Sequence, residues 1–305
     1  MHHPVFARFR PAKRDVDPTE FGIDSFLGTT FRRAYNSSWS SYLPSYPPPI
    51  DEEYFEWIDL LTAVVEANEL FTFIELGAGY GRWSIRAAAA ARQFGILKVR
   101  LACVEAEATH FEWLRQTLID NGLDPDAHLL RCAAVCGHGG QALFQLSKDR
   151  DSLRYAPAVF YGQAVVQAPS SPAILRLRNE IRAAMTRVLR HRVPSQTSVD
   201  AVTLDEVLNP FASVDLIDLD VQGAELDIID SSHNVLNDKV KRLHIGTHSA
   251  TVELGLRRSL FRLGWTCTAD YGCSTTTESP YGVVTFQDGV QSWLNPRLSG
   301  WLSPS

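Results

Sequence analysis

From Phe71 onward, short apolar runs alternate with segments of helical periodicity, and no other feature constrains the fold as strongly. Repeated strand–helix units of this kind build a parallel sheet covered by helices. We therefore predict an α/β chain with a Rossmann-like, mostly parallel seven-stranded sheet. The expected strands are 71–76, 98–105, 128–136, 214–219, 242–247 and a C-terminal antiparallel hairpin of 266–271 with 282–287. The expected helices between them include 82–93, 111–118 and 253–263.

Two segments lie outside this alternation. Residues 1–50 are rich in Arg, Ser, Pro and aromatic residues, which predicts an irregular N-terminal arm. Residues 51–305 form the predicted domain, which opens with a helix and carries a helical insertion at about 147–200. In the insertion, 174–192 combines an apolar stripe with six arginines. Three interpretations stay open for this basic helix: a solvated helix packed on the core, a lid or clamp for an acidic substrate, or a nucleic-acid surface.

The composition of the chain indicates which binding partners and which cellular compartment to expect. The chain carries 29 basic and 35 acidic side chains, so its formal net charge of −6 favours neither nucleic acid nor an anionic membrane. Five cysteines, without a CxxC pair, predict free thiols in a reducing compartment. No run is apolar enough for a signal peptide or a membrane span, so we expect a cytoplasmic protein. The sequence leaves the oligomeric state open.

The first expected strand runs into a glycine-rich turn with the pattern E-x-G-x-G-x-G. Glycines at such a turn let backbone N–H groups approach a ligand closely. A nicotinamide site would place its third glycine at position 82, which is Arg82 here. The spacing instead suits S-adenosylmethionine, whose ammonium Glu75 can meet directly or through water. The predicted cofactor-binding residues of the turn are Glu75, Gly77, Ala78, Gly79 and Gly81.

Two further strand ends extend the predicted cofactor site. The second strand ends at Glu105, whose carboxylate can accept hydrogen bonds from both ribose hydroxyls. The third strand ends near Ala133 and Ala134, where small side chains leave room for a flat adenine. Because the carboxyl ends of parallel strands meet at one edge of an open sheet, we expect these residues to lie together. The simpler interpretation of Glu105 is a solvated carboxylate near a helix start.

The fourth expected strand is unusually acidic. Period two places Asp218 and Asp220 on one face, with Asp215 on the other. A carboxylate inside a parallel strand is costly unless it is paired, bound to metal or at the open end, so we expect Asp220 to face the cofactor's methyl group. Glu225 follows at the start of the next helix. Helix capping and first-turn charge remain the alternative role for Asp220 and Glu225.

With these motifs the chain resembles the FkbM family of methyltransferases over roughly residues 70–290. The resemblance rests on FIELGAGYGRWS (73–84), VEAE (104–107), FYGQAVV (160–166), AVTLDEVL (201–208), VDLIDLDVQGAELDII (214–229) and LHIGTHS (243–249). It implies the class I methyltransferase form of the Rossmann-like fold and O-methylation of a hydroxyl on a sugar or another natural product. Two positions depart from the family pattern: Asp218 replaces a common Lys, and Gly246 stands where Glu often precedes the histidine.

Methyl transfer to oxygen requires that the acceptor be aligned and its proton removed. The candidate bases are His248, at the end of the fifth strand, and Asp220. In an alternative scheme, Asp218, Asp220 and His248 hold a divalent cation such as Mg²⁺ that acidifies the hydroxyl.

Four residues are candidates to contact the acceptor or the cofactor in such a reaction. They are Tyr80, Tyr161, Gln163 and Glu225. The expected partner is a small-molecule or sugar acceptor.

Three other functions are alternatives to methyl transfer to a small molecule. A nicotinamide-dependent Rossmann enzyme conflicts with the glycine spacing and with the acidic fourth strand. A nucleic-acid methyltransferase would usually follow that strand with an Asn/Asp-Pro-Pro-aromatic run, whereas this chain has Asp-Val-Gln-Gly at 220–223. A cofactor-binding protein without catalysis stays open.

Overall fold

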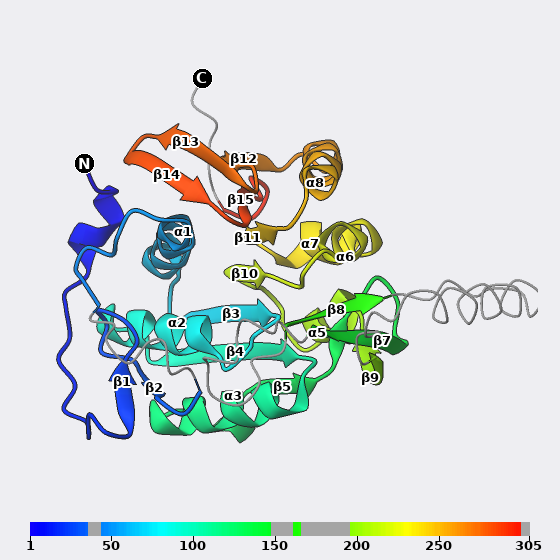
Figure 1. Cartoon of the computed structure of the whole chain (residues 1–305). Coiled ribbons are helices and arrows are strands. Elements are labelled where there is room, and N and C mark those ends of the chain that lie inside the picture. Colours follow the sequence, from blue (N-terminus) through cyan, green and yellow to red (C-terminus); the bar gives the residue numbers. More distant parts are fainter. Residues whose placement is uncertain (36–43, 148–160, 166–195, 300–305) are drawn as a thin grey trace, which may run out of the picture.

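The computed structural model describes residues 1–35, 44–147, 161–165 and 196–299. A seven-stranded sheet in the order β12-β15-β11-β10-β3-β4-β5 forms its centre (Figure 1). All its strands except β15 run in the same direction, and β15 is antiparallel to both β11 and β12. The strands are β3 (Leu70–Leu76), β4 (Lys98–Glu105), β5 (Leu129–Cys132), β10 (Leu216–Leu219), β11 (Arg242–Thr247), β12 (Thr266–Tyr271) and β15 (Gly289–Leu294). The predicted mostly parallel α/β sheet is confirmed.

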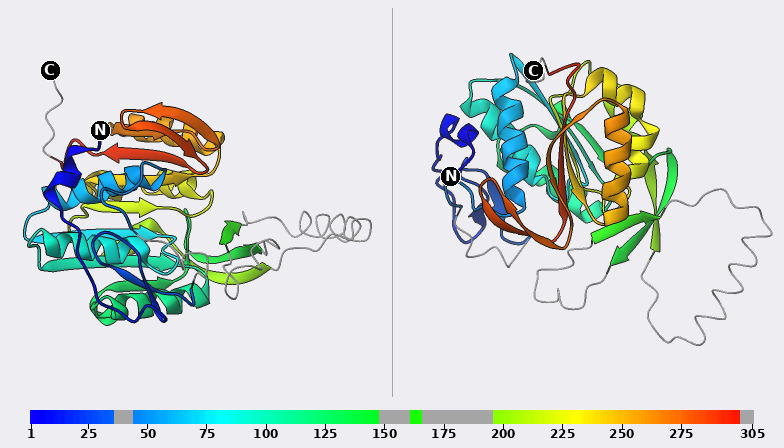
Figure 2. Two further views of the ribbon diagram at one scale, coloured as in Figure 1. Left: turned by 60° about the vertical axis from the view of Figure 1, so that its left-hand side comes forward. Right: turned by 90° about the horizontal axis from the view of Figure 1, so that it is seen from above.

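Helices cover both faces of this sheet. Figure 2 shows α1 and α2 on one side, and α6, α7 and α8 on the other. The first side comprises α1 (Glu53–Glu66), α2 (Arg82–Gln93) and α3 (Ala108–Asp120). The second comprises α5 (Leu204–Leu208), α6 (Glu225–Ser231), α7 (His233–Lys239) and α8 (Ala250–Arg262).

Two apolar cores follow from the alternation of side chains along the strands. Phe71 and Phe73 of β3 belong to the core beneath α1, α2 and α3, whereas Ile74 and Leu76 belong to the core beneath α5–α8. Strands that are buried on both faces read as continuous apolar runs, and β3 is buried at every position after Leu70. The same alternation places Glu75 and Asp218 on the α1–α2 side, where they are register partners.

The structure corrects the predicted sheet at two places, and the first is the third expected strand. Instead of one strand over 128–136, the chain forms β5 and then β6 (Ala134–Val135), which joins a different sheet of order β6-β9-β7-β8. The chain changes sheet at Ala133, whose N–H donates to the carbonyl of Glu105. The small sheet includes β7 (Gly140–Ser147), β8 (Tyr161–Val165) and β9 (Gln196–Val202). The predicted basic helix over 174–192 lies outside the described residues.

The second correction concerns the C-terminal strands. Thr266–Tyr271 pairs with β15 and not with the expected 282–287 segment. That segment contains β14 (Gly282–Phe286), which forms a separate hairpin with β13 (Thr275–Ser279). The burial of the two candidate strands explains the difference, because every residue of β15 is buried whereas β14 is exposed at three of its five positions. A fully buried strand suits the interior of the main sheet.

The first 35 residues pack against the α1–α2 side of the domain. They contain a 3₁₀ helix, η1 (Pro4–Arg8), and a small hairpin of β1 (Phe21–Ile23) with β2 (Thr30–Arg32). Phe6, Phe9 and Phe26 are part of the core beneath α1, α2 and α3. Tyr35 stacks on Trp113 of α3 at a ring-centroid distance of 4.6 Å.

A buried ion-pair network ties this N-terminal segment to α2. The Asp24 carboxylate, which is fully buried, contacts Arg86 Nε at 2.7 Å and Arg82 Nε at 3.0 Å. Both arginines also pair with Glu53 of α1. The Arg86 guanidinium lies over the ring of Trp83, 4.3 Å from its centroid, and its side chain is 1% exposed. Buried charges of this kind are tolerated because each has an opposite partner.

Among the residues described, the structure contains no helix with the length and apolar character needed to cross a membrane.

Replacing Asp24 by alanine removes one carboxylate from the buried guanidinium of Arg86 and from the partly buried guanidinium of Arg82. We expect Asp24→Ala to lower the free energy of unfolding by about 3 kcal/mol, measured by urea denaturation. Glu20→Gln is the matched control, because the Glu20–Arg32 pair is exposed and such pairs contribute less than about 1 kcal/mol. Equal losses in the two variants would contradict a structural role for the buried network.

Candidate functional site

The glycine-rich turn lies between β3 and α2 at the carboxyl edge of the sheet. Gly77, Gly79 and Gly81 have φ angles of +84°, +53° and +80°, a region that glycine adopts more easily than any other residue. Gly77 packs directly on the next strand: a Cβ there would lie 1.8 Å from the carbonyl oxygen of Asp220. A Cβ on Gly79 would meet nothing within 4 Å. The turn is therefore closed against β10 at Gly77 and open at Gly79.

Two predicted cofactor residues, Glu75 and Ala78, support the turn from within. The buried Glu75 carboxylate accepts the N–H of Ser84 at 2.9 Å and that of Trp83 at 3.3 Å, and so binds the free N–H groups at the start of α2. Burial, and then the nearby Asp218 carboxylate, raise the pKa of Glu75 to about 8. The N–H of Ala78, like that of Gly77, donates to the carbonyl of Val104.

Glu105 lies at the open part of the turn. Its carboxylate accepts the N–H of Gly79 at 2.7 Å and the N–H of Glu107 at 2.7 Å. Burial raises its pKa to about 7. Ala133 and Ala134 follow β5, the strand next to β4, and both are buried; Ala134 pairs with Ala201 of β9. The structure thus brings Glu105 to the glycine turn and places the two alanines at the end of the neighbouring strand.

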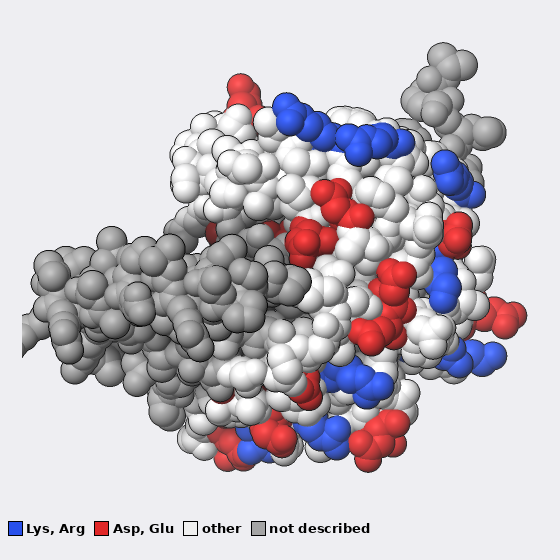
Figure 3. Space-filling model, turned by 90° about the vertical axis from the view of Figure 1, so that its right-hand side faces the viewer, with Lys and Arg blue, Asp and Glu red and all other residues white. Residues whose placement is uncertain are grey.

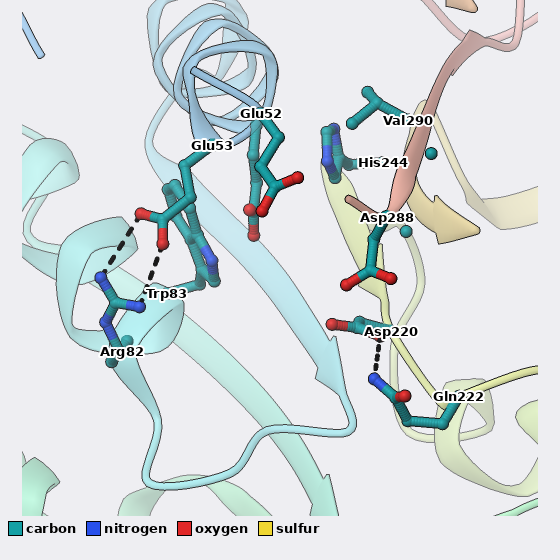
Figure 4. A pocket seen from close by; sticks show the side chains of 12 residues that line it. Glu52, Glu53, Arg82, Trp83, Asp220, Gln222, His244, Asp288 and Val290 are labelled. Carbon is teal, nitrogen blue, oxygen red and sulfur yellow. Dashed lines mark hydrogen bonds and ion pairs between the residues drawn. The ribbon is translucent and has the colours of Figure 1, made fainter. Parts of the chain in front are cut away.

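A cavity of about 430 Å³ opens beside the turn, between the N-terminus of α1 and the ends of β10 and β11 (Figure 4). It is strongly acidic. Its lining residues are Glu52, Glu53, Glu56, Arg82, Trp83, Asp220, Gln222, His244, Gly246, Asp288, Gly289 and Val290. Glu53 pairs with Arg82, while Asp220 and Asp288 lie next to each other on the opposite wall. This cavity is the candidate active site.

Asp220 and His248, the two candidate bases, are in direct contact. His248 Nε2 lies 3.2 Å from Asp220 Oδ1, and Nδ1 lies 3.0 Å from Oε1 of the fully buried Glu225. Burial by itself lowers the pKa of His248, but the neighbouring carboxylates of Asp220 and Glu225 outweigh it and raise the pKa to about 10. His248 is therefore an imidazolium near neutral pH. The Asp220 side chain is 50% exposed and faces the cavity.

The structure separates the three residues of the predicted metal set. Among the described residues, the acidic and histidine groups close enough to share one ion are Asp220, Glu225 and His248, which lie within 4.8 Å of one another. Asp218 does not belong to this group, because its side chain points beneath α1. Both ring nitrogens of His248 already face carboxylates, so an imidazolium accounts for the proximity of the three residues. We assign no metal to them.

Asp218 instead lies near Glu56 of α1. Burial raises the pKa of Glu56, and burial raises the pKa of Asp218 to about 6. Sequence reasoning missed Glu56 and its neighbours in the cavity wall. A signal for them existed, since Glu52, Glu53 and Glu56 have the three- and four-residue spacing of one helix face. Asp288 was also missed, and no motif marks it.

The residues predicted to contact the acceptor lie in different parts of the structure. Glu225 lies behind His248, away from the cavity lining. The backbone of Tyr161 and Gln163 lies in β8, at the edge of the small sheet, where these residues pair with Ser147 and Gln145. The side chains of Tyr161 and Gln163 are outside the described part of the structure. Tyr80 packs near Tyr35, and burial raises its pKa to about 12.

Comparison with known proteins identifies the family. The model of the methyltransferase FkbM domain matches residues 76–257, which include the glycine turn, Glu105, Asp220 and His248. The chain belongs to the FkbM methyltransferase family. A protein of Jannaschia sp. (strain CCS1) that carries a methyltransferase name is 29% identical over 245 residues, covering 80% of this chain and 79% of the relative.

Solved structures similar to this FkbM protein share little sequence with it. The methyltransferase FkbM of Methylobacillus flagellatus KT has 9% identity and a TM-score of 0.43, covering 74% of this chain and 44% of that one. The precorrin-6y C5,15-methyltransferase of Geobacter metallireducens GS-15 has 10% identity and a TM-score of 0.39, covering 77% and 86%. An O-methyltransferase of Bacillus cereus in complex with SAH has 12% identity and a TM-score of 0.37, covering 81% and 82%.

The closed and open ends of the glycine turn predict unequal effects of the same substitution. Gly77→Ala places a methyl group on the Asp220 carbonyl, so we expect it to lower the free energy of unfolding by more than about 3 kcal/mol. We expect Gly79→Ala to lower the free energy of unfolding by only about 1 kcal/mol, the cost of a left-handed backbone conformation at an alanine. Urea denaturation of both variants measures the difference, and similar losses would show that the clash is relieved by loop movement.

The ion pairs of His248 predict how stability depends on pH. The folded-state pKa of about 10 lies above the ordinary 6.5, so the stabilisation is complete below pH 6.5 and is lost as the pH rises through 10. Between about pH 7 and pH 9, the wild type should lose up to about 1.4 kcal/mol more per pH unit than His248→Gln. Urea denaturation across this range measures the slopes. Parallel slopes would mean that His248 is neutral.

Proposed function

We propose that this FkbM protein transfers a methyl group from S-adenosylmethionine to a hydroxyl of a small molecule, such as a sugar or another natural product. The observation that carries the proposal is a half-exposed carboxylate, Asp220, in an acidic cavity beside an open glycine turn. Family membership supports methyl transfer, and the chemistry of these side chains supports the donor and the hydroxyl acceptor.

The residues at the glycine turn suit S-adenosylmethionine. Glu105 offers carboxylate oxygens for the two ribose hydroxyls, and the open space at Gly79 leaves room for a ligand against the backbone. Ala133 and Ala134 are the candidates beside the adenine. When bound, S-adenosylmethionine supplies a methyl group on a positively charged sulfur. Glu75 is bound to the first turn of α2, so we infer that it acts on the methionine end through this turn.

Of the two candidate bases, Asp220 is the better one. The imidazolium of His248 has no free electron pair to accept a proton, whereas a carboxylate has. His248 and Glu225 then act as positioning residues: the ring is fixed by Glu225 at one nitrogen and orients Asp220 at the other. Asp220 is thereby held at the cavity, where it can accept the proton of an acceptor hydroxyl.

The lining of the cavity favours a hydroxylated acceptor. Glu52, Asp220, Gln222 and Asp288 present oxygen atoms that accept hydrogen bonds, which suits a ligand with several O–H donors. On the described part of the face in Figure 3, Asp and Glu side chains lie between the groups of Lys and Arg, so no continuous basic surface for a phosphate backbone forms there. We therefore propose a small-molecule acceptor over a nucleic acid.

The proposal is tested by calorimetric titration with S-adenosylmethionine, followed by an assay of methyl transfer to a panel of sugars and polyketides. We expect micromolar binding, lost at least about tenfold in Glu105→Ala because both ribose contacts disappear. Asp220→Asn should retain this binding but lower kcat by about a hundredfold, since removal of a general base typically costs this much.

Each result separates the proposal from its alternatives. Absence of S-adenosylmethionine binding to the folded protein would refute it, and binding of NADH instead would indicate a nicotinamide enzyme. Binding without transfer to any acceptor, with biological activity intact in Asp220→Asn, would indicate a cofactor-binding protein without catalysis.

A further inference from the structure

A buried histidine of β11 lies at the wall of the cavity and uses only one of its ring nitrogens in a hydrogen bond. His244 is 3% exposed and belongs to the lining of the cavity. Its Nδ1 lies 2.8 Å from Oδ2 of Asp59 in α1. Among the described residues, Nε2 has no hydrogen-bond partner, and it is not one of the unpartnered side-chain atoms that are closed off from solvent. The free nitrogen of His244 therefore opens into the cavity.

Two other elements hold the ring of His244 in place. Asp59 is 5% exposed, and its Oδ2 also accepts the hydroxyl of Ser292 in β15. Ser292 is in turn the register partner of His244 in the main sheet. Because a carboxylate only accepts hydrogen bonds, the hydrogen of the contact between His244 and Asp59 is on Nδ1. A carboxylate that binds one imidazole nitrogen in this way fixes the ring and leaves the other nitrogen for a ligand.

His244 reaches the same cavity as Asp220, the proposed base (Figure 4). His244 and Gly246 are two positions apart in β11, so they lie on one face with a separation of about 7 Å. Asp220 is next to Gly246, since a Cβ on this glycine would lie 3.4 Å from Asp220 Cγ. Two hydrogen bonds of about 2.8 Å each cover most of this separation. One acceptor molecule with two hydroxyls can therefore contact Asp220 and His244 together.

We propose that His244 is a specificity-determining residue of the acceptor site, whose Nε2 binds a second hydroxyl while Asp220 takes the proton of the first. This inference rests on the proposed function, because it concerns how the acceptor of that reaction is held. A hydroxyl suits Nε2 in either protonation state, since an O–H group donates to a free nitrogen and accepts from an N–H. An acceptor with a single hydroxyl leaves Nε2 unpaired in a closed site, which disfavours its binding.

Matched acceptors that differ by one hydroxyl test the inference on the full chain. The probes are catechol with phenol, and vicinal cyclohexanediol with cyclohexanol, each assayed with saturating S-adenosylmethionine. We expect kcat/KM to be at least about tenfold higher for the diol of each pair, because it makes one more hydrogen bond to the protein. The difference should arise mainly in KM, since the second hydroxyl is bound before and during the reaction alike.

Variants assign this preference to His244. In His244→Phe, which keeps a ring but has no nitrogen, the preference for the diol should disappear through a higher KM. His244→Gln should restore part of it, because its amide can still bond a hydroxyl. Asp59→Asn should lower the preference to an intermediate value, a change that a purely structural role of Asp59 would not produce. His233→Phe is the matched control and should keep the full preference, because His233 also contacts a serine, at 3.0 Å, but lies outside the cavity lining.

Nitrogen NMR of protein with isotope-labelled histidine gives a second measurement, which requires neither turnover nor a folded His244→Phe variant. With S-adenosylhomocysteine bound, vicinal cyclohexanediol should shift the Nε2 signal of His244, and cyclohexanol should shift it less. The signal is identified by its absence in His244→Gln.

The outcomes separate this inference from the proposed function. If S-adenosylmethionine does not bind the folded protein, the proposed function fails, and the role of His244 fails with it. If diols and their single-hydroxyl partners are methylated equally well and the Nε2 signal does not move, the role of His244 is refuted while the proposed function stands. A preference for diols that persists in His244→Phe would also refute the assignment and place the second contact elsewhere.

Discussion

The parallel pairing of β3 with β10 is the constraint on which the site depends. It brings the glycine turn against Asp220 so closely that only a residue without a side chain fits at Gly77. The backbone N–H of Asp220 donates to the carbonyl of Leu76, which fixes the ends of the two strands together. From this contact the turn reaches Glu105 on one side and the acidic cavity on the other.

Electrostatics on the α1–α2 side follow one rule, that a buried charge needs a partner. Asp24 satisfies Arg82 and Arg86, and Glu75 satisfies the start of α2. Carboxyl groups near the cavity do not have such a partner and are accommodated in other ways. Burial raises the pKa of Glu56 and of Asp218, whereas Asp220 remains half exposed beside His248. Of these groups, Glu56 and Asp220 line the cavity.

Much of the fold could be predicted from the chain because its strands carry strong local signals. The apolar runs at 98–105 and 242–247 are strands with the predicted bounds. Pairing was less predictable, since an alternating or apolar run does not specify its neighbour. The chain leaves the main sheet after Cys132, and β15 rather than β14 joins β12. Both outcomes depend on which surfaces become buried, and burial is a property of the assembled fold.

In the candidate site, too, some features could be predicted from the sequence and others depended on the assembled fold. The glycine turn, the acidic residues Glu105 and Asp220 and the family could be predicted from the sequence, because each depends on residues close together in the chain. The contact of His248 with Glu225 rather than Asp218, and the proximity of Glu56 to Asp218, required the folded chain. Such contacts join helices and strands from distant parts of the chain. They set the protonation of each group, which no spacing of residues along a sequence can specify.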